Sequence, residues 1–208
     1  MDDLYVAARR VLLDGLGALG AHRDALILVG AQAVYLRVGE GDLAVAPYTT
    51  DADLAIDPSR LAEIPPLEQS LRDAFFRPQS NQSVGIWVTT RTIAAKEVDI
   101  SIDLLVPATA SRNAGSRAAD LTGHDRKAAR NVEGLDGALV DNDTMQVGSL
   151  DPDDDRSYEL SIAGPAALLT SKLHKIADRA GTGRLSDKDA LDVLRLLRGT
   201  ATDDLSRR

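Results

Sequence analysis

The sequence predicts an α/β (α+β) fold, in which a mixed sheet has flanking helices and a small helical part follows at the C-terminus. Three observations support this prediction. Short apolar or alternating runs typical of strands recur between residues 25 and 162, runs with helical spacing lie between and around them, and Gly and Pro mark many of the boundaries. The 208 residues fit one compact domain, and a hydrophobic content of 44% is enough to bury a core.

The individual elements follow from the periodicity of the apolar residues. We expect helices at residues 4–20, 31–38, 65–76, 165–179 and 187–198, the last with Ser186 as its N-cap. We expect strands at residues 25–29, 50–57, 84–90 and 98–106, with weaker ones at 138–148 and 157–162. We expect residues 107–134 to form a loop with one short helix. The best boundary lies at Gly164, between a core of residues 1–163 and a helical part of residues 164–208.

The composition excludes several kinds of site. The chain has no Cys and only three His, which excludes disulfides and thiolate metal sites and argues against a histidine-built zinc site. A net charge of −8 argues against a generally basic surface for nucleic acid, although it leaves room for a local basic patch. No apolar run is long enough for a membrane span, and the N-terminus lacks a signal peptide's apolar centre, so we expect a cytoplasmic protein.

The most informative segment is the strand pattern at residues 50–57. Its apolar residues Ala52, Leu54 and Ile56 share one face, so the carboxylates of Asp51 and Asp53 project side by side from the other face. Like charges held this close repel, and a divalent cation such as Mg²⁺ relieves the repulsion. Alone, the D-x-D pattern is more typical of a solvated strand face.

A second acidic strand, residues 98–106, strengthens the metal interpretation. Asp99 and Asp103 both lie opposite its apolar face. If this strand lies beside the first, three carboxylates could hold two Mg²⁺ ions about 3.5–4 Å apart. Asp103 is the preferred third carboxylate because it directly precedes the apolar stretch Leu104–Val106, and Asp99 is the other candidate.

The order of these motifs resembles the nucleotidyltransferase superfamily related to DNA polymerase β. The order in the chain is a strand, the turn Gly30–Ala33, a helix, the segment Thr49-x-Asp51-x-Asp53 and a later aspartate strand. In particular, the chain resembles the AbiEii-type toxin nucleotidyltransferases, which include the mycobacterial MenT toxins. The C-terminal segments 171–179 and 186–192 match the lysine-rich helix and the Lys-Asp-x-x-Asp pattern of that family. Two residues depart from the family pattern, Pro47 and Ala31.

The resemblance implies a transfer of a nucleoside monophosphate from an NTP, with Mg²⁺ as cofactor and Mn²⁺ as a substitute. It implies that Asp51, Asp53 and Asp103 are the catalytic and metal-binding residues, with Asp103 as the base. It also implies that the substrate-binding residues are Gly30, Ala31, Gln32, Thr49, Thr50, Lys172, Lys175, Arg179, Lys188 and Asp189. In this scheme the turn at Gly30 and the following helix start receive the triphosphate, together with Lys172.

Ordinary structural roles are alternatives for several of these residues. Cations late in the helix 165–179 also complement its dipole, Ser186-x-x-Asp189 is typical of a capping box, and Gly30 could simply end a strand.

The acceptor and the cellular role stay open at this point. For the toxin relatives the acceptor is often the 3′ end of tRNA, and a toxin would have a cognate antitoxin protein as partner. A small molecule or a protein hydroxyl would suit the same chemistry. A local basic patch could grip RNA or be a solvated loop; its members are Arg112, Arg117, His124, Arg126, Lys127 and Arg130. The main alternative function is a non-catalytic nucleotide- or protein-binding module, and a further one is a scaffold whose acidic strands only resist edge pairing.

Overall fold

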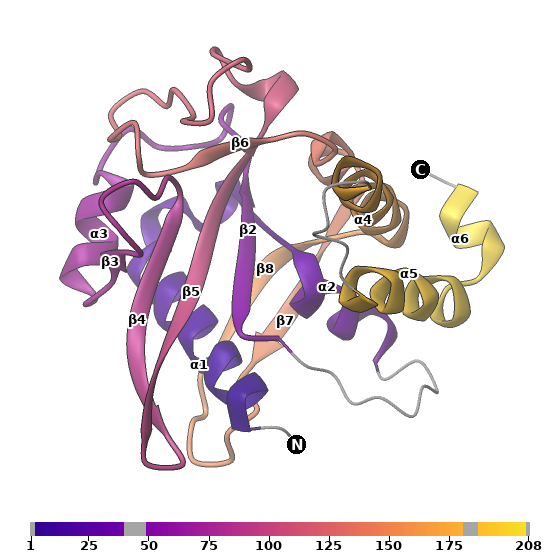
Figure 1. Ribbon diagram of the computed structural model, residues 1–208, viewed down its shortest axis with the longest axis horizontal. Coiled ribbons are helices and arrows are strands. Elements are labelled where there is room, and N and C mark those ends of the chain that lie inside the picture. The colour runs from indigo at the N-terminus through magenta and orange to yellow at the C-terminus, as the bar shows by residue number, and fades with distance from the viewer. Residues whose placement is uncertain (1–2, 40–48, 181–186, 207–208) are drawn as a thin grey trace.

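The computed structural model describes residues 3–39, 49–180 and 187–206, so the predictions that concern Pro47 and Ser186 lie outside the described residues. A mixed eight-stranded sheet forms the centre, with helices on both of its faces (Figure 1). This arrangement confirms the predicted fold class.

The strands are arranged in the order β3-β4-β5-β2-β1-β8-β7, and β6 pairs with the end of β5. Their bounds are β1 (Leu26–Val29), β2 (Asp51–Ile56), β3 (Arg77–Pro78), β4 (Ile86–Ile93), β5 (Lys96–Pro107), β6 (Arg130–Val132), β7 (Asn142–Gly148) and β8 (Ser157–Ala163). The pairs β2–β5, β1–β8 and β5–β6 are parallel, whereas the other neighbours are antiparallel. The parallel pair β2–β5 brings the two acidic strands together in the middle of the sheet.

The described residues form six α-helices. They are α1 (Asp3–Ala18), α2 (Gly30–Val38), α3 (Leu67–Asp73), α4 (Pro165–Arg179), α5 (Asp187–Gly199) and α6 (Thr202–Ser206). Three short 3-10 helices complete the structure: η1 (Gly20–Ala25), η2 (Ala108–Ala110) and η3 (Asp136–Leu139). None of the helices in the described residues is long and apolar enough to cross a membrane.

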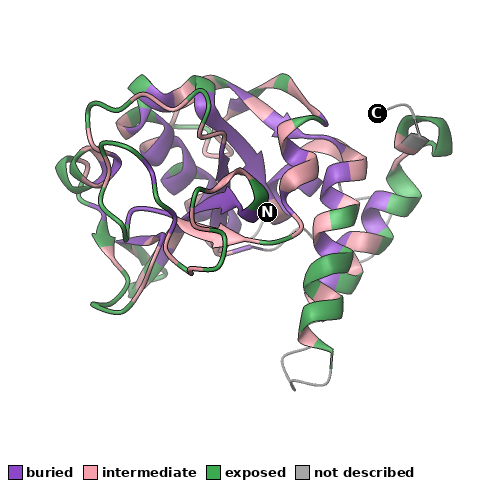
Figure 2. Cartoon of the chain, turned by 90° about the horizontal axis from the view of Figure 1, so that it is seen from above, coloured by how far each residue is buried: buried purple, intermediate pink, exposed green. Residues whose placement is uncertain are grey.

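Helix α1 lies on the apolar face of the acidic strands. Gly15 is so close to Ile102 of β5 that a β-carbon at this position would collide with the isoleucine side chain. Because side chains alternate along a strand, Asp103 must face the opposite side, where α2, α4 and α5 pack together (Figure 1). Figure 2 shows the buried residues concentrated in the sheet and on the adjoining helix faces. The acidic residues therefore face the helices at the C-terminal end of the chain.

Several element boundaries differ from the sequence prediction. The predicted helix at 4–20 ends at Ala18, and η1 then occupies residues up to the start of β1. The predicted strand at 98–106 is longer, since β4 and β5 form a hairpin whose turn residues Ala94 and Ala95 have positive φ angles. The short strands β3 and β6 and the helix α6 were not predicted, because two to five residues carry too little periodicity to detect.

A bend at Gly85, directly before β4, lies between this end of β4 and the start of β6 at the edge of β5. The Gly85 N–H donates to the carbonyl of Lys127 at 2.9 Å, and its own carbonyl accepts from the Leu104 N–H at 2.7 Å. Gly85 has a φ of +69°, and a β-carbon there would lie 2.6 Å from the Leu104 carbonyl oxygen and 2.7 Å from the Arg130 nitrogen. Glycine is thus required at this position, where the pairing of β5 with β4 ends and its pairing with β6 begins.

We expect the substitution Gly85→Ala to lower the free energy of unfolding by at least about 1–3 kcal/mol, the cost of a non-glycine residue in the left-handed region. The collision with two backbone atoms adds to this cost. Urea denaturation would measure the change, with Gly115→Ala as the control because no atom approaches that glycine within 4 Å. Equal stability of the two variants would contradict this account of the bend.

Candidate active site

The register between β2 and β5 aligns two of the predicted carboxylates. Asp53 is the direct partner of Asp103, and Asp51 is the partner of Ser101. The three aspartates lie on one face of the sheet, while their neighbours Ala52, Ile102 and Leu104 are buried on the other. The structure therefore gathers Asp51, Asp53 and Asp103 on one face, although their catalytic and metal-binding roles stay predictions.

Asp99, the other candidate for the third carboxylate, lies away from this group. It is four residues from Asp103, about 13 Å along an extended strand, and its cross-strand partner is Thr90. Its carboxylate accepts a hydrogen bond from the Thr90 hydroxyl at 2.7 Å and forms an ion pair with Arg77 at 2.8 Å. These two contacts lower the pKa of Asp99. Asp99 thus belongs to the exposed end of the β4–β5 hairpin.

Asp53 lies at the most crowded point of the acidic group. Burial, together with the charges of Asp51 and Asp103, raises its pKa to about 7 against the opposing effect of Lys175 and Lys172. Helix α2 begins at Gly30, which has a φ of +71° and approaches Asp53 so closely that a β-carbon would collide with the carboxylate. Gly30 is therefore required at this position, and the start of α2 lies directly beside Asp53.

Asp51 is held by contacts to its side chain and its backbone. The Thr49 hydroxyl donates to its carboxylate, and Lys188 of α5 donates to the Thr49 hydroxyl oxygen at 3.1 Å. The Lys188 nitrogen is also 3.9 Å from the Asp51 carboxylate. Below the strand, the buried Gln32 amide donates to the Asp51 carbonyl at 3.1 Å and accepts from Arg9 at 2.8 Å. Thr49, Gln32 and Lys188 therefore position Asp51, and substrate contacts by these residues stay predictions.

Asp103 is paired with an arginine from β6. Its Oδ2 atom accepts a hydrogen bond from the Arg130 guanidinium at 2.7 Å, and both side chains are largely buried. Burial raises the pKa of Asp103, and Arg130 opposes that effect. The sequence pattern predicted that Arg130 lies in a loop that could grip an acceptor. The structure corrects this position, because Arg130 lies in the sheet and contacts the acidic group itself.

The remaining cations of that predicted patch are mostly engaged as well. Lys127 donates to the Asn81 carbonyl at 2.8 Å, and Arg112 donates to the Thr122 hydroxyl at 2.8 Å. His124 accepts from the Leu67 N–H at 3.1 Å and lies 3.0 Å from the Ala62 carbonyl oxygen, so it is part of the loop's internal structure. These contacts fix parts of the loop, while the side chains of Arg112, Arg117, Arg126 and Lys127 stay exposed, so their role in gripping an acceptor stays a prediction.

Helices α4 and α5 are joined by a buried network of charges. The Lys172 ammonium donates to Asp192 at 2.7 Å and to Asp189 at 3.1 Å, and all three residues are buried. Burial alone would lower the pKa of Lys172, but the two carboxylates more than offset it and the pKa is raised. Asp189 also pairs with Arg179 at 3.0 Å and with Lys175 at 3.4 Å.

These contacts distinguish the predicted phosphate-binding lysines. Lys172 is enclosed by carboxylates, which is the environment of a structural cation. Lys175 lies one turn further along α4, and its side chain is 46% exposed. Asp189 follows Lys188, which contacts Asp51, and it binds cations of α4. The triphosphate roles of Lys172, Lys175 and Arg179 stay predictions, and the geometry favours Lys175 as the residue that reaches a ligand.

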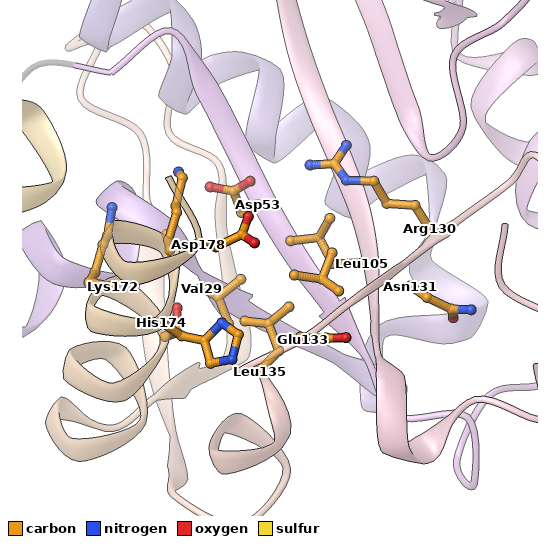
Figure 3. Close-up of a pocket in the computed structure, with 14 residues that line it drawn as sticks. Val29, Asp53, Leu105, Arg130, Asn131, Glu133, Leu135, Lys172, His174 and Asp178 are labelled. Carbon is orange, nitrogen blue, oxygen red and sulfur yellow. The ribbon is translucent and has the colours of Figure 1, made fainter. Parts of the chain in front are cut away.

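A pocket of about 380 Å³ opens between the acidic strands and α4 (Figure 3). Asp53 and Gly30 lie on one side, and Lys172, Lys175, His174 and Asp178 of α4 line the other side. Further lining residues come from β1, β5 and the segment around β6, and include Val29, Leu105, Arg130, Asn131, Val132, Glu133 and Leu135. The pocket thus joins carboxylates and cations to an apolar wall, a combination that suits an anionic ligand with a flat or apolar part.

The donor set fits a divalent ion only in part. Within residues 3–39, 49–180 and 187–206, no three His, Asp or Glu side chains are already grouped around one metal position. Asp51 and Asp53 nevertheless offer the oxygen ligands that Mg²⁺ prefers. Burial and the neighbouring carboxylates raise the pKa of Asp53, and the two lysines Lys175 and Lys172 offset this only in part. A cation beside Asp51 and Asp53 would compensate the negative charge of these carboxylates.

The fold is that of nucleotidyltransferase-like proteins of known structure. The chain is similar to an antigenic nucleotidyltransferase-like protein from Paracoccidioides brasiliensis, with a TM-score of 0.52 and 17% identity over 94% of this chain and 76% of that one. It is also similar to the antibiotic-resistance factor ANT(2'')-Ia, with a TM-score of 0.54 and 14% identity over 99% of this chain and 89% of that one.

At these identities the similarity shows the fold alone. No protein-family profile matches the sequence, and a search of curated proteins finds no relative. The resemblance to the AbiEii-type toxin family therefore stays a prediction, and so does the division at Gly164.

We expect Asp192→Ala to lower the free energy of unfolding by about 3–5 kcal/mol, because it removes a fully buried carboxylate that pairs with the buried cations Lys172 and Arg195. Asp187→Ala, at the exposed start of the same helix, is the matched control. Chemical denaturation would measure both variants. A loss for Asp192→Ala no larger than that of the control would show that the network contributes little to stability.

We expect Asp53 to make the metal-free protein less stable as the pH rises from about 4 to about 7. The pKa of Asp53 is raised from 3.8 to about 7 in the folded state, so the folded chain binds more protons than the unfolded chain in this window. The free energy of unfolding then falls by at most about 1.4 kcal/mol per pH unit. The difference between the parent and Asp53→Asn across this range isolates the effect, and a flat difference would contradict the raised pKa.

Proposed function

We propose that this chain is a metal-dependent nucleotidyltransferase that moves a nucleoside monophosphate from an NTP to an acceptor hydroxyl. The alignment of Asp53 with Asp103, next to the glycine start of α2, is the observation that carries the proposal. It places mutually repelling carboxylates at the edge of a pocket that also holds exposed Lys175. Such an arrangement is costly without a ligand, and it suits a metal-bound triphosphate.

The residues have distinct roles in this scheme. Asp51 and Asp53 would hold a divalent ion, which when bound neutralises charge on the phosphates. The first N–H groups of α2 at Gly30 and Ala31 would donate to phosphate oxygens, and Lys175 would pair with the same anion. Lys172, Asp189 and Arg179 would keep α4 and α5 in the orientation that directs Lys175 into the pocket.

The transfer then needs one base and one leaving group. Asp103 would accept the proton of the acceptor hydroxyl as the hydroxyl oxygen bonds to the α-phosphorus. The bond between the α-phosphorus and the bridging oxygen to the β-phosphate breaks, and pyrophosphate leaves with the electron pair of that bond. The acceptor thereby gains a nucleoside monophosphate through a phosphodiester bond.

The acceptor we propose to test first is the 3′ end of tRNA, which follows from the resemblance to AbiEii-type toxins. In that case the chain would be the toxin of a toxin–antitoxin pair and would have an antitoxin protein as partner. A small hydroxyl-bearing molecule is a second candidate, favoured because Arg130 of the predicted patch pairs with Asp103 inside the site and does not face an extended RNA. Both acceptors use the same bond-forming step.

The purified chain should transfer label from one of four α-labelled NTPs to an acceptor in total RNA or in a small-molecule extract when Mg²⁺ is present. Asp103→Ala should reduce the rate about 100-fold or more, the usual contribution of a general base. Asp99→Ala is the matched control on the same strand and should keep the parent rate, because Asp99 lies outside the acidic group.

The double variant Asp51→Ala/Asp53→Ala tests the alternative of a non-catalytic binding module. The proposal expects this variant to lose both transfer and Mg²⁺-dependent NTP binding. If the variant binds NTP and Mg²⁺ as well as the parent, the carboxylates do not serve a metal-bound nucleotide and the enzyme proposal fails. The position of the label identifies the acceptor class, since tRNA and a small molecule separate readily by size.

A further inference from the structure

The pairing of Asp103 with Arg130 changes how many metal ions the proposed site can hold. Three carboxylates on adjacent strands would ordinarily accommodate two divalent ions. In this chain, however, Asp103 Oδ2 already has a guanidinium nitrogen at 2.7 Å. Arginine stays charged at all accessible pH values, so this pairing cannot be relieved by deprotonation. A divalent ion placed on the same carboxylate would lie a few ångströms from a fixed positive charge.

The position of Arg130 is built into the sheet. Arg130 is the first residue of β6 and the parallel partner of Leu105, two residues after Asp103. The bend at Gly85 ends the pairing of β4 with β5 at this point and leaves the edge of β5 open for β6. The Ala129 carbonyl accepts from the Ala119 N–H at 3.1 Å, which fixes the chain just before the arginine. The backbone of Arg130 is therefore fixed at the sheet edge beside Asp103.

Arg130 also has an unused donor. Its Nη1 atom is buried and has no hydrogen-bond partner among the described residues. The same side chain lines the pocket that contains Asp53. A buried guanidinium N–H without an acceptor is costly, and a phosphate oxygen in the pocket would satisfy it. Arg130 thus has the charge, the location and the free donor of a group that would contact the transferred phosphate.

We propose that the site binds one divalent ion, between Asp51 and Asp53, and that Arg130 supplies the second positive charge beside Asp103. This inference rests on the proposed function and specifies its cofactor requirement. Asp103 then acts through its carboxylate as a base and is no metal ligand, while Arg130 fixes its orientation. The bound ion and the guanidinium together offset the charge of the three aspartates.

Counting Mn²⁺ ions tests this inference directly. Free Mn²⁺ would be measured by electron paramagnetic resonance during titration of the whole chain, with and without a non-hydrolysable NTP analogue. We expect one bound Mn²⁺ per chain. Asp53→Asn should weaken its binding by at least about tenfold, since loss even of a residue outside the first coordination sphere typically costs 10–100-fold in affinity. Asp103→Asn should leave the stoichiometry at one ion and weaken binding less than Asp53→Asn does, because it removes a neighbouring charge and not a ligand.

Replacing Arg130 with an uncharged residue should create a second metal-binding position at Asp103. We expect Arg130→Gln to bind a second Mn²⁺, because Asp103 then has no paired cation. Arg130→Lys should remain at one ion, since it keeps the charge. Arg126→Gln changes an exposed arginine just before β6, is the matched control, and should also bind one ion. Circular dichroism would confirm that each variant is folded before the ions are counted.

Each outcome is decisive for one of the two proposals. Two Mn²⁺ ions in the parent, or equal weakening by Asp103→Asn and Asp53→Asn, would overturn the single-ion inference and leave the proposed transferase function intact. A single ion in folded Arg130→Gln would overturn the role assigned to Arg130. Absence of Mn²⁺ binding by the parent, even with the NTP analogue, would overturn the proposed function itself.

Discussion

The parallel pairing of β2 with β5 is the constraint on which the rest of the site depends. It places Asp53 beside Asp103 and sets both opposite the core that α1 covers. Hydrophobic burial of Ala52, Ile102 and Leu104 on the other face fixes this register, because a shift by one residue would turn the carboxylates into the core. The energy of the core thereby holds like charges together, and burial together with these charges raises the pKa of Asp53.

The protein offsets part of this cost with cations from distant parts of the chain. Arg130 neutralises Asp103 from the edge of β5, and Lys188 approaches Asp51 from the first turn of α5. The next residue of α5, Asp189, binds the cations of α4. One helical turn therefore contacts both the acidic strands and the lysine-bearing helix, so α5 couples the proposed metal and phosphate positions. Asp53 is left as the carboxylate without a close ion pair among the described contacts.

The sequence predicted the central elements of this arrangement because they are long or strongly patterned. The alternation in residues 50–57 and 98–106 is enough to place Asp51, Asp53 and Asp103 opposite the apolar faces of their strands. It could not separate Asp99 from Asp103, since both share that face and only the register with β2 distinguishes them. The sequence placed Arg130 in a basic loop and missed its pairing with Asp103, because it lies in a three-residue strand within a stretch of small, polar and basic residues, where periodicity gives no signal. The structural role of Lys172 was hidden for a different reason, because its partners Asp189 and Asp192 come from another helix.

The distribution of charge explains how an acidic protein can present a site for a polyanion. The net charge is −8, yet around the pocket the carboxylates of α5 form ion pairs with Lys172, Arg179 and Arg195. This leaves Lys175 and the unpaired donor of Arg130 to act on the pocket itself. The net charge of the chain opposes non-specific binding of extended nucleic acid. The electrostatics around the pocket thus favour a compact phosphate-bearing ligand, as the proposed function requires.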